Sequence, residues 1–249
     1  MAPTHICKGS SIGRNTDLAA RKNDNYMKKR KVELYEPISK YYIFCEGEKT
    51  EPNYFEGFKK AIETNSIYEN RVIIHIAGTG SETKRVINAA EDFVNNNNVR
   101  NAEIWCVYDK DDFPAEDFNA VSEMANSLTN KYESLSYKVA WSNQCIEYWF
   151  ILHFDYYDAN NDRKSYRKYL HEKFSKSGLK RYEKNNPDIF KILCDFGDPK
   201  QAVRHAQRQL SNFVGKTDSE SAPATKVHLL VEELSKYLPE PIKAKFTDC

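Results

Sequence analysis

The chain has 249 residues, 40% of them hydrophobic and 29% charged, which excludes a disordered chain and leaves ample material for a buried core. Its 37 basic residues nearly balance its 36 acidic ones, so the net charge of +1 points to no class of partner. The six cysteines are widely spaced and include no CxxC pair, which argues against a zinc site and for reduced thiols. The longest strongly apolar run, YWFILHF, is too short to span a bilayer, and no signal peptide opens the chain, so we expect a cytoplasmic protein.

The first 38 residues are polar and basic and show no hydrophobic periodicity, which predicts a flexible arm at 1–38. From there strand-like and helix-like segments alternate. Strands are predicted at Tyr41–Cys45, Arg71–Gly78, Glu103–Asp109 and Tyr137–Ser142. Helices are predicted at Asn53–Thr64, around 83–94 and from Pro114 to about Tyr132. This order predicts an α/β fold in which a parallel sheet carries helices on both faces.

The pattern changes after the fourth strand. The segment Cys145–Phe154 is apolar nearly all round, which predicts a buried helix. Beyond it, the sequence indicates helices at Lys200–Val214 and Thr225–Leu238, preceded by a basic, tyrosine-rich segment. We therefore expect a catalytic domain at 39–154 and a helical, partly basic lobe at 155–249.

Carboxylates follow two of the predicted strands. Glu46 comes directly after the first strand, and Asp109, Asp111 and Asp112 follow the third in the string WCVYDKDD. Active sites of open α/β sheets form outside the carboxyl ends of the strands, where close negative charges are costly unless a cation lies between them. Mg²⁺ or Mn²⁺ suits such oxygen ligands and a phosphate substrate.

Structural roles compete with this interpretation. Asp112 could cap the helix after Pro114, and Thr50 or Glu51 could cap the helix that follows the first strand. Glu48 and Glu51 could equally favour the positive end of that helix.

Four segments make the chain recognisable, and they occur in this order: CEGEKTEPNYF (Cys45–Phe55), WCVYDKDD (Trp105–Asp112), SNQCIEYWFILHF (Ser142–Phe154) and APATKVHLLV (Ala222–Val231). Together they resemble the RloB-like family, and the Glu and DxD pair resembles the Toprim domain of topoisomerases, primases and nucleases. The family commonly has Pro where Gln144 stands. The resemblance covers roughly residues 38–235.

The resemblance implies a metal-dependent phosphodiester nuclease on a Toprim-like Rossmannoid sheet. Glu46 would act as a general acid or base, and Asp109 and Asp111 would hold Mg²⁺. Glu147 matches an acidic position of the family, so it is either a further metal ligand or the partner of an Arg or Lys from the helical lobe. Glu48, Glu51 and Asp112 could lie just outside the metal's own ligands.

Two basic regions are candidates for nucleic-acid binding. The first contains Lys164, Arg167 and Lys168, interleaved with tyrosines that could stack on unpaired bases. The second is a stripe at every fourth residue, Lys200, Arg204 and Arg208, although most such stripes are solvated helix faces.

We therefore expect a Toprim-type endonuclease that cleaves RNA, such as tRNA, or DNA in bacterial anti-phage defence. Relatives in abortive-infection loci imply a separate ABC-type ATPase as partner, and a homodimer is a further expectation. One alternative is a catalytically silent subunit that binds nucleic acid or the ATPase. A DxD glycosyltransferase would explain the metal pair but neither Glu46 nor the basic lobe.

Overall fold

A computed structural model describes residues 39–80 and 83–247 of the chain. The arm predicted at 1–38 lies outside the described residues. The first half contains β1 (Ser39–Cys45), α1 (Thr50–Glu63), β2 (Val72–Gly78), α2 (Thr83–Asn96), β3 (Ala102–Asp109), α3 (Ala115–Lys131) and β4 (Leu135–Asn143). The second half contains α4 (Ile146–Ile151), α5 (Arg163–Lys176), α6 (Ile189–Phe196), α7 (Pro199–Ser211), β5 (Ala224–Thr225), α8 (Val227–Ser235) and α9 (Glu240–Lys243).

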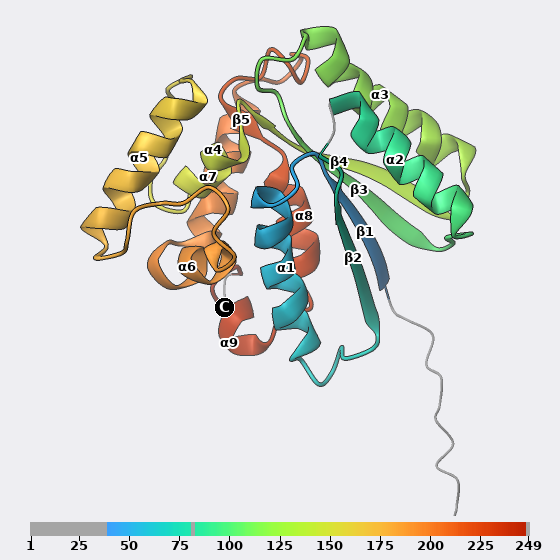
Figure 1. Ribbon diagram of the computed structural model, residues 1–249, viewed down its shortest axis with the longest axis horizontal. Helices are drawn as coiled ribbons and strands as arrows, with labels where there is room; N and C mark the ends of the chain where they lie inside the picture. The colour runs from blue at the N-terminus through green and yellow to red at the C-terminus, as the bar shows by residue number, and fades with distance from the viewer. Residues whose placement is uncertain (1–38, 81–82, 248–249) are drawn as a thin grey trace, which may run out of the picture. The chain divides into compact units, whose positions relative to one another are not determined.

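The five strands form one sheet in the order β2-β1-β3-β4-β5 (Figure 1). The first four strands are parallel, as predicted, because a helix after each of the first three returns the chain to the same end of the sheet. The two-residue β5 pairs antiparallel with the end of β4 and was not predicted, since two residues carry no periodicity. The predicted α/β class is confirmed.

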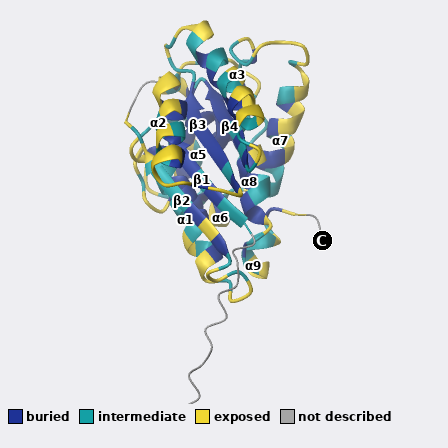
Figure 2. Ribbon diagram, turned by 90° about the vertical axis from the view of Figure 1, so that its right-hand side faces the viewer, coloured by how far each residue is buried: buried dark blue, intermediate teal, exposed yellow. Residues whose placement is uncertain are grey.

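Alternating strand residues divide the core into two layers. Ile43 and Val107 belong to a hydrophobic cluster with α1, α4 and α8, whereas Phe44 and Cys106 belong to a cluster with α2 and α3. Because successive side chains of a strand point to opposite faces, each strand supplies both clusters. The central strands β1, β3 and β4 are accordingly largely buried between helices on both faces of the sheet, whereas the edge strand β2 is only partly buried (Figure 2).

The segment after β4 adds its helices to the α1 side of the sheet rather than forming a separate core. Phe58 of α1 packs on Phe190 of α6 with ring centroids 4.5 Å apart. Gly57 permits this approach, because a Cβ at that position would lie 2.2 Å from the Cβ of Phe190. The residues on either side of position 154 therefore share one hydrophobic cluster.

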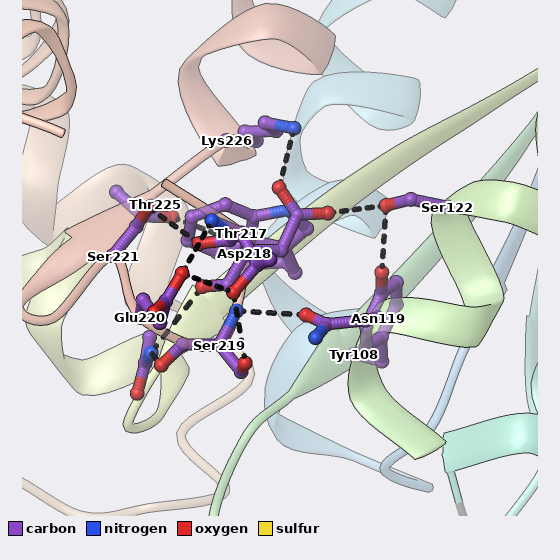
Figure 3. Close-up of polar contacts among 12 residues, drawn as sticks. Tyr108, Asn119, Ser122, Thr217, Asp218, Ser219, Glu220, Ser221, Thr225 and Lys226 are labelled. Atoms are coloured by element: carbon purple, nitrogen blue, oxygen red, sulfur yellow. Dashed lines mark hydrogen bonds and ion pairs between the residues drawn. The ribbon is translucent and has the colours of Figure 1, made fainter. Parts of the chain in front are cut away.

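A polar loop fastens β5 to the rest of the sheet (Figure 3). The carboxylate of Asp218 accepts a hydrogen bond from the hydroxyl of Ser122 in α3. It also forms an ion pair with Lys226, whose Nζ lies 2.8 Å from Oδ1 of Asp218. Asn143 at the end of β4 donates to the carbonyl of Ser219 at 3.0 Å. These contacts fix the end of β4 and the segment around β5 relative to α3.

Several local predictions change. The buried helix expected at Cys145–Phe154 is shorter, because α4 ends at Ile151. Neither Thr50 nor Glu51 caps α1, since the helix already begins at Thr50 and its N-cap residue, Lys49, makes no side-chain capping bond. The cysteines among the described residues, Cys45, Cys106, Cys145 and Cys194, are free and buried. Within residues 39–80 and 83–247, no helix combines the length and apolarity needed to cross a membrane.

Candidate active site at the carboxyl edge of the sheet

The structure brings Glu46 and Asp109 together at the carboxyl ends of neighbouring strands. Cys45 of β1 is in register with Val107 of β3, and the backbone N–H of Glu46 continues the ladder by donating to the carbonyl of Val107 at 2.8 Å. The Glu46 side chain then turns towards β3, where its Oε2 accepts the backbone N–H of Asp109 at 3.2 Å. Two residues that lie 63 positions apart thus share one edge.

Asp109 is held in place by the start of α4. Its Oδ2 accepts the backbone N–H of Ile146 at 3.2 Å, one of the N–H groups that the first turn of a helix leaves without a partner. Its other oxygen, Oδ1, is buried and has no hydrogen-bond partner. A buried carboxylate oxygen without a donor is costly, so Asp109 offers a ligand position towards the cavity.

Asp111 lies in the loop that leaves β3. Its backbone has a φ of +39°, and its N–H donates to the carbonyl of Gln144 at 2.9 Å. Its Oδ2 pairs with Nη1 of Arg163 at 3.2 Å, while Oδ1 is buried without a partner. Like Asp109, it therefore directs one unpaired oxygen into buried space.

Glu51 joins this group, although the sequence left it open between the start of α1 and the surroundings of the metal. It lies in the first turn of α1, is only 5% exposed, and its Oε2 is buried without a partner. The carboxylate lies against the backbone of Gly47, where an added Cβ would be 2.2 Å from Oε2. A signal was present in the sequence, because Glu51 is four residues before Phe55 and seven before Phe58, on the apolar face of the helix.

A cavity of about 540 Å³ opens over these carboxylates. Its lining comes from the β1–α1 turn, the β2–α2 turn, the loop after β3 and the α5–α6 connection: Glu46, Gly47, Glu48, Lys49, Thr50, Glu51, Gly80, Asp109, Asp111, Phe113, Lys184 and Asn185. The site is therefore an acidic hollow at the carboxyl edge of the sheet, where α/β proteins bind their ligands.

The carboxylates perturb one another. Burial raises the pKa of Asp109 well above its ordinary range, and the negative charges of Glu51 and Asp111 raise it further. Burial also raises the pKa of Glu51, with Glu147 adding to the effect. For Asp111 burial raises the pKa, while the positive charges of Arg163 and Lys184 oppose the increase. Such mutual repulsion is relieved when a cation enters the hollow.

Glu147 has a partner of its own. Its side chain is 1% exposed, and its Oε1 accepts hydrogen bonds from Nε of Arg167 at 2.8 Å and from the hydroxyl of Tyr182 at 3.3 Å. Of the two roles predicted for Glu147, the ion pair with the helical lobe is the one present in the structure. Arg167, predicted to contact nucleic acid, is used in that pair.

The fit to a metal ion rests on the three unpaired oxygens. In the described part of the chain, no group of three or more His, Cys, Asp or Glu side chains is placed so that it could already hold a metal ion. However, the unpaired oxygens of Asp109, Asp111 and Glu51 are all carboxylate atoms, the donors that Mg²⁺ and Mn²⁺ prefer. Their chemistry and burial fit such an ion.

Comparison with known proteins adds the family. The family model described as RloB-like protein matches residues 41–234. The chain belongs to the RloB-like family. The predicted family is thereby confirmed, over nearly the predicted range. No curated protein and no solved structure is significantly similar to the chain.

Two further acids of this RloB-like chain were predicted to lie just outside the ligands of the metal. Glu48 is exposed and lines the cavity beside Gly80. The Asp112 side chain is 93% exposed and pairs with Nη2 of Arg163 at 3.0 Å. The predicted capping role of Asp112 is wrong, because α3 has Pro114 at its N-cap and no side chain caps it.

The remaining predicted nucleic-acid contacts of the RloB-like chain do not line the cavity. Lys164 and Lys168 are exposed on α5. Lys200, Arg204 and Arg208 lie along α7, and the guanidinium of Arg208 lies 4.0 Å from the ring centroid of Tyr156. All five belong to the part of the chain that follows α4.

Base stacking on the α5 tyrosines is not supported. Tyr166 is fully buried against Tyr148 and Tyr157, and Tyr182 is 3% exposed. The hydroxyl of Tyr169 donates to Asp155, and its ring packs edge-on against Tyr157. These rings form the core between α4 and α5, because the spacing that looked suited to recognition is also the spacing of a helix's buried face.

Proposed function

We propose that this RloB-like protein is a metal-dependent endonuclease of the Toprim type. The observation that carries the proposal is the group of buried, unpaired carboxylate oxygens on Asp109, Asp111 and Glu51, beside Glu46 and open to one cavity. An arrangement that stores negative charge without partners is unfavourable for the empty protein and favourable for binding a divalent cation.

Asp109 and Asp111 would hold Mg²⁺ or Mn²⁺, with Glu51 and Glu46 close enough to complete its environment. When bound, the ion would stabilise negative charge at a phosphodiester and orient it. Glu46 is less buried than Asp109, and one of its oxygens accepts the Asp109 N–H at 3.2 Å. That hydrogen bond orients the Glu46 carboxylate towards the cavity, where it could take up or deliver a proton at the reacting oxygen.

The substrate we propose is RNA, with tRNA as the first candidate, or DNA. The family occurs in defence loci, so cleavage during phage infection would halt growth of the host. A separate ABC-type ATPase would act as the sensor, and dimerisation would accompany activation. Lys164 and Lys168 on α5, and the α7 stripe, would contact the sugar-phosphate backbone at a distance from the reacting group.

A catalytically silent subunit is the second candidate function. Two observations favour it: no group of three or more His, Cys, Asp or Glu side chains among the described residues is placed to hold a metal ion, and Arg163 already pairs with Asp111 at 3.2 Å. In that case the hollow would bind an ion for structural reasons, and the basic surfaces would bind nucleic acid or the ATPase.

The two candidates differ in one experiment. Purified wild type, Glu46→Gln and Glu63→Gln proteins are incubated with tRNA, single-stranded DNA and duplex DNA in Mg²⁺, Mn²⁺ or EDTA, and the products are resolved on denaturing gels. Glu63 is the matched control, because it is an exposed glutamate at the far end of α1. Cleavage that needs the metal and Glu46, but not Glu63, supports the nuclease.

The contrary result is equally clear. If wild type and Glu46→Gln bind a nucleic acid equally and neither cuts it, even after the product of a neighbouring ATPase gene is added, the protein is the silent subunit.

A further inference from the structure

Lys184 is a cation at the acidic cavity for which neither the sequence nor the family resemblance supplied a role. It lies in the connection between α5 and α6 and lines the cavity together with Glu46, Asp109 and Asp111. Its side chain is exposed and makes no hydrogen bond or ion pair with any other described residue. An ammonium group without a partner beside buried carboxylates is available for an anionic ligand.

The backbone around Lys184 is fixed on both sides. Two residues earlier, the buried Tyr182 donates its hydroxyl to Glu147 at 3.3 Å. One residue later, Asn185 accepts hydrogen bonds from Thr50 Oγ1 at 3.2 Å and from Asn53 Nδ2 at 3.0 Å. Both anchors reach residues of the acidic site or the first turn of α1. The connection is therefore positioned relative to the carboxylates, although it has no regular secondary structure.

The charges around the cavity distinguish Lys184 from the two arginines near the buried acids. Its positive charge lowers the pKa of both Glu51 and Asp111, so its ammonium lies within electrostatic range of both. Arg163 is committed to Asp111 and Asp112, and Arg167 to Glu147. Of the basic side chains close to the buried acids, Lys184 is thus one that can turn to a ligand without breaking an ion pair.

We propose that Lys184 binds a non-bridging oxygen of the phosphodiester group that enters the cavity. An acidic hollow repels an anionic substrate, and a lysine at its wall supplies a compensating charge and three hydrogen-bond donors. The inference rests on the proposed function, because it assigns the position of the phosphate in that site. In this proposal, the α5–α6 connection positions the phosphate-binding lysine at the carboxyl edge of the sheet.

The test measures binding separately from cleavage. Wild type, Lys184→Gln, Lys184→Arg and Lys60→Gln are titrated in EDTA with fluorescein-labelled tRNA and with a labelled DNA duplex, at several salt concentrations, by fluorescence anisotropy. Lys60 is the matched control, because it is an exposed lysine on α1 that does not line the cavity. Single-turnover cleavage of the same probes in Mg²⁺ follows, and thermal unfolding verifies that all four proteins fold.

We expect Lys184→Gln to bind the preferred probe about tenfold more weakly and to lower the slope of log K against log salt by about 0.7 to 0.9, the value for one lost phosphate contact. Lys184→Arg should retain most of the affinity, and Lys60→Gln should match wild type. A Lys184→Gln protein with the wild-type slope and affinity overturns the inference.

The outcomes also separate this inference from the proposed function. If wild type cuts a probe and Lys184→Gln binds and cuts it equally well, the role of Lys184 is refuted and the nuclease stands. If wild type binds but never cuts, the nuclease is refuted, and the change in salt slope still decides the role of Lys184. If wild type binds neither probe, both are refuted.

Discussion

Replacing Asp109 with Asn should stabilise the metal-free protein, because it removes a charge that the fold does not neutralise. The side chain is 9% exposed and faces the charges of Glu51, Asp111, Glu147 and Glu46. Asn has nearly the same shape, and its carbonyl oxygen can still accept the N–H of Ile146, so the change removes charge with little loss of packing.

The size of the effect depends on pH. Since the pKa of Asp109 is raised in the fold, the folded protein holds this proton more tightly than the unfolded chain, and ionisation at higher pH costs stability. Two unit charges about 6 Å apart interact by about 3 kcal/mol at an effective dielectric constant of about 20. With four neighbouring acids partly offset by basic residues, we expect Asp109→Asn to gain about 3 kcal/mol at high pH and little at pH 5. For a protein of this length, that gain raises Tm by roughly 6 to 12 °C.

A bound metal ion should reverse the order of stability of wild type and Asp109→Asn. An ion at about a hundred times its Kd stabilises the folded state by about 2.7 kcal/mol. We therefore expect Mg²⁺ or Mn²⁺ to raise the Tm of wild type but not that of Asp109→Asn. Differential scanning fluorimetry in EDTA and in metal, from pH 5 to 9, measures both effects. Asp92→Asn, an exposed aspartate on α2, is the control and should follow wild type.

Two results would refute this reasoning. One is a lower Tm for Asp109→Asn than for wild type in EDTA at high pH. The other is an equal metal-induced shift in the two proteins.

Three other predictions follow from the packing around the site. Arg167→Met should lower the free energy of unfolding, measured in urea titrations, by about 3 to 5 kcal/mol, because it leaves Glu147 buried without its cation. The double variant Arg167→Met/Glu147→Gln should recover much of that loss. A single variant as stable as wild type would contradict the role of the pair. Burial lowers the pKa of His153 to about 4, so the stability that its neutral imidazole contributes is complete above pH 6.5 and declines as the pH falls, by about 3 kcal/mol at pH 4. For His153→Gln, the free energy of unfolding should therefore fall less steeply between pH 6.5 and pH 4. An unchanged pH dependence would count against a neutral buried imidazole. Gly47→Ala should displace the Glu51 carboxylate, because its Oε2 would lie 2.2 Å from the new Cβ. The metal-induced rise in Tm should then be smaller than in wild type, while the far-UV circular dichroism stays unchanged. A rise in Tm equal to that of wild type would show that Glu51 takes no part in binding the metal.

The local pattern of the sequence carries most of the fold. The helix after β1, for example, was predicted at Asn53–Thr64 and is observed at Thr50–Glu63. It could be found because an apolar residue at every fourth position is visible within a short stretch of sequence. The segment between α5 and α7 was less accessible to prediction. Helix α6 was not assigned, since eight residues give little periodicity.

The sequence by itself also placed Glu46 and Asp109 at the same edge, because each directly follows a parallel strand and the carboxyl ends of parallel strands lie together. Only the tertiary structure decided what surrounds them. Whether Glu147 meets a metal or Arg167, and whether Lys184 reaches the cavity, depends on how the helices after β4 pack against α1. Those contacts join residues 20 or more positions apart, and burial then determines which charges remain unpaired. The spacing of apolar residues along the sequence therefore predicts neither the partner of Glu147 nor the position of Lys184.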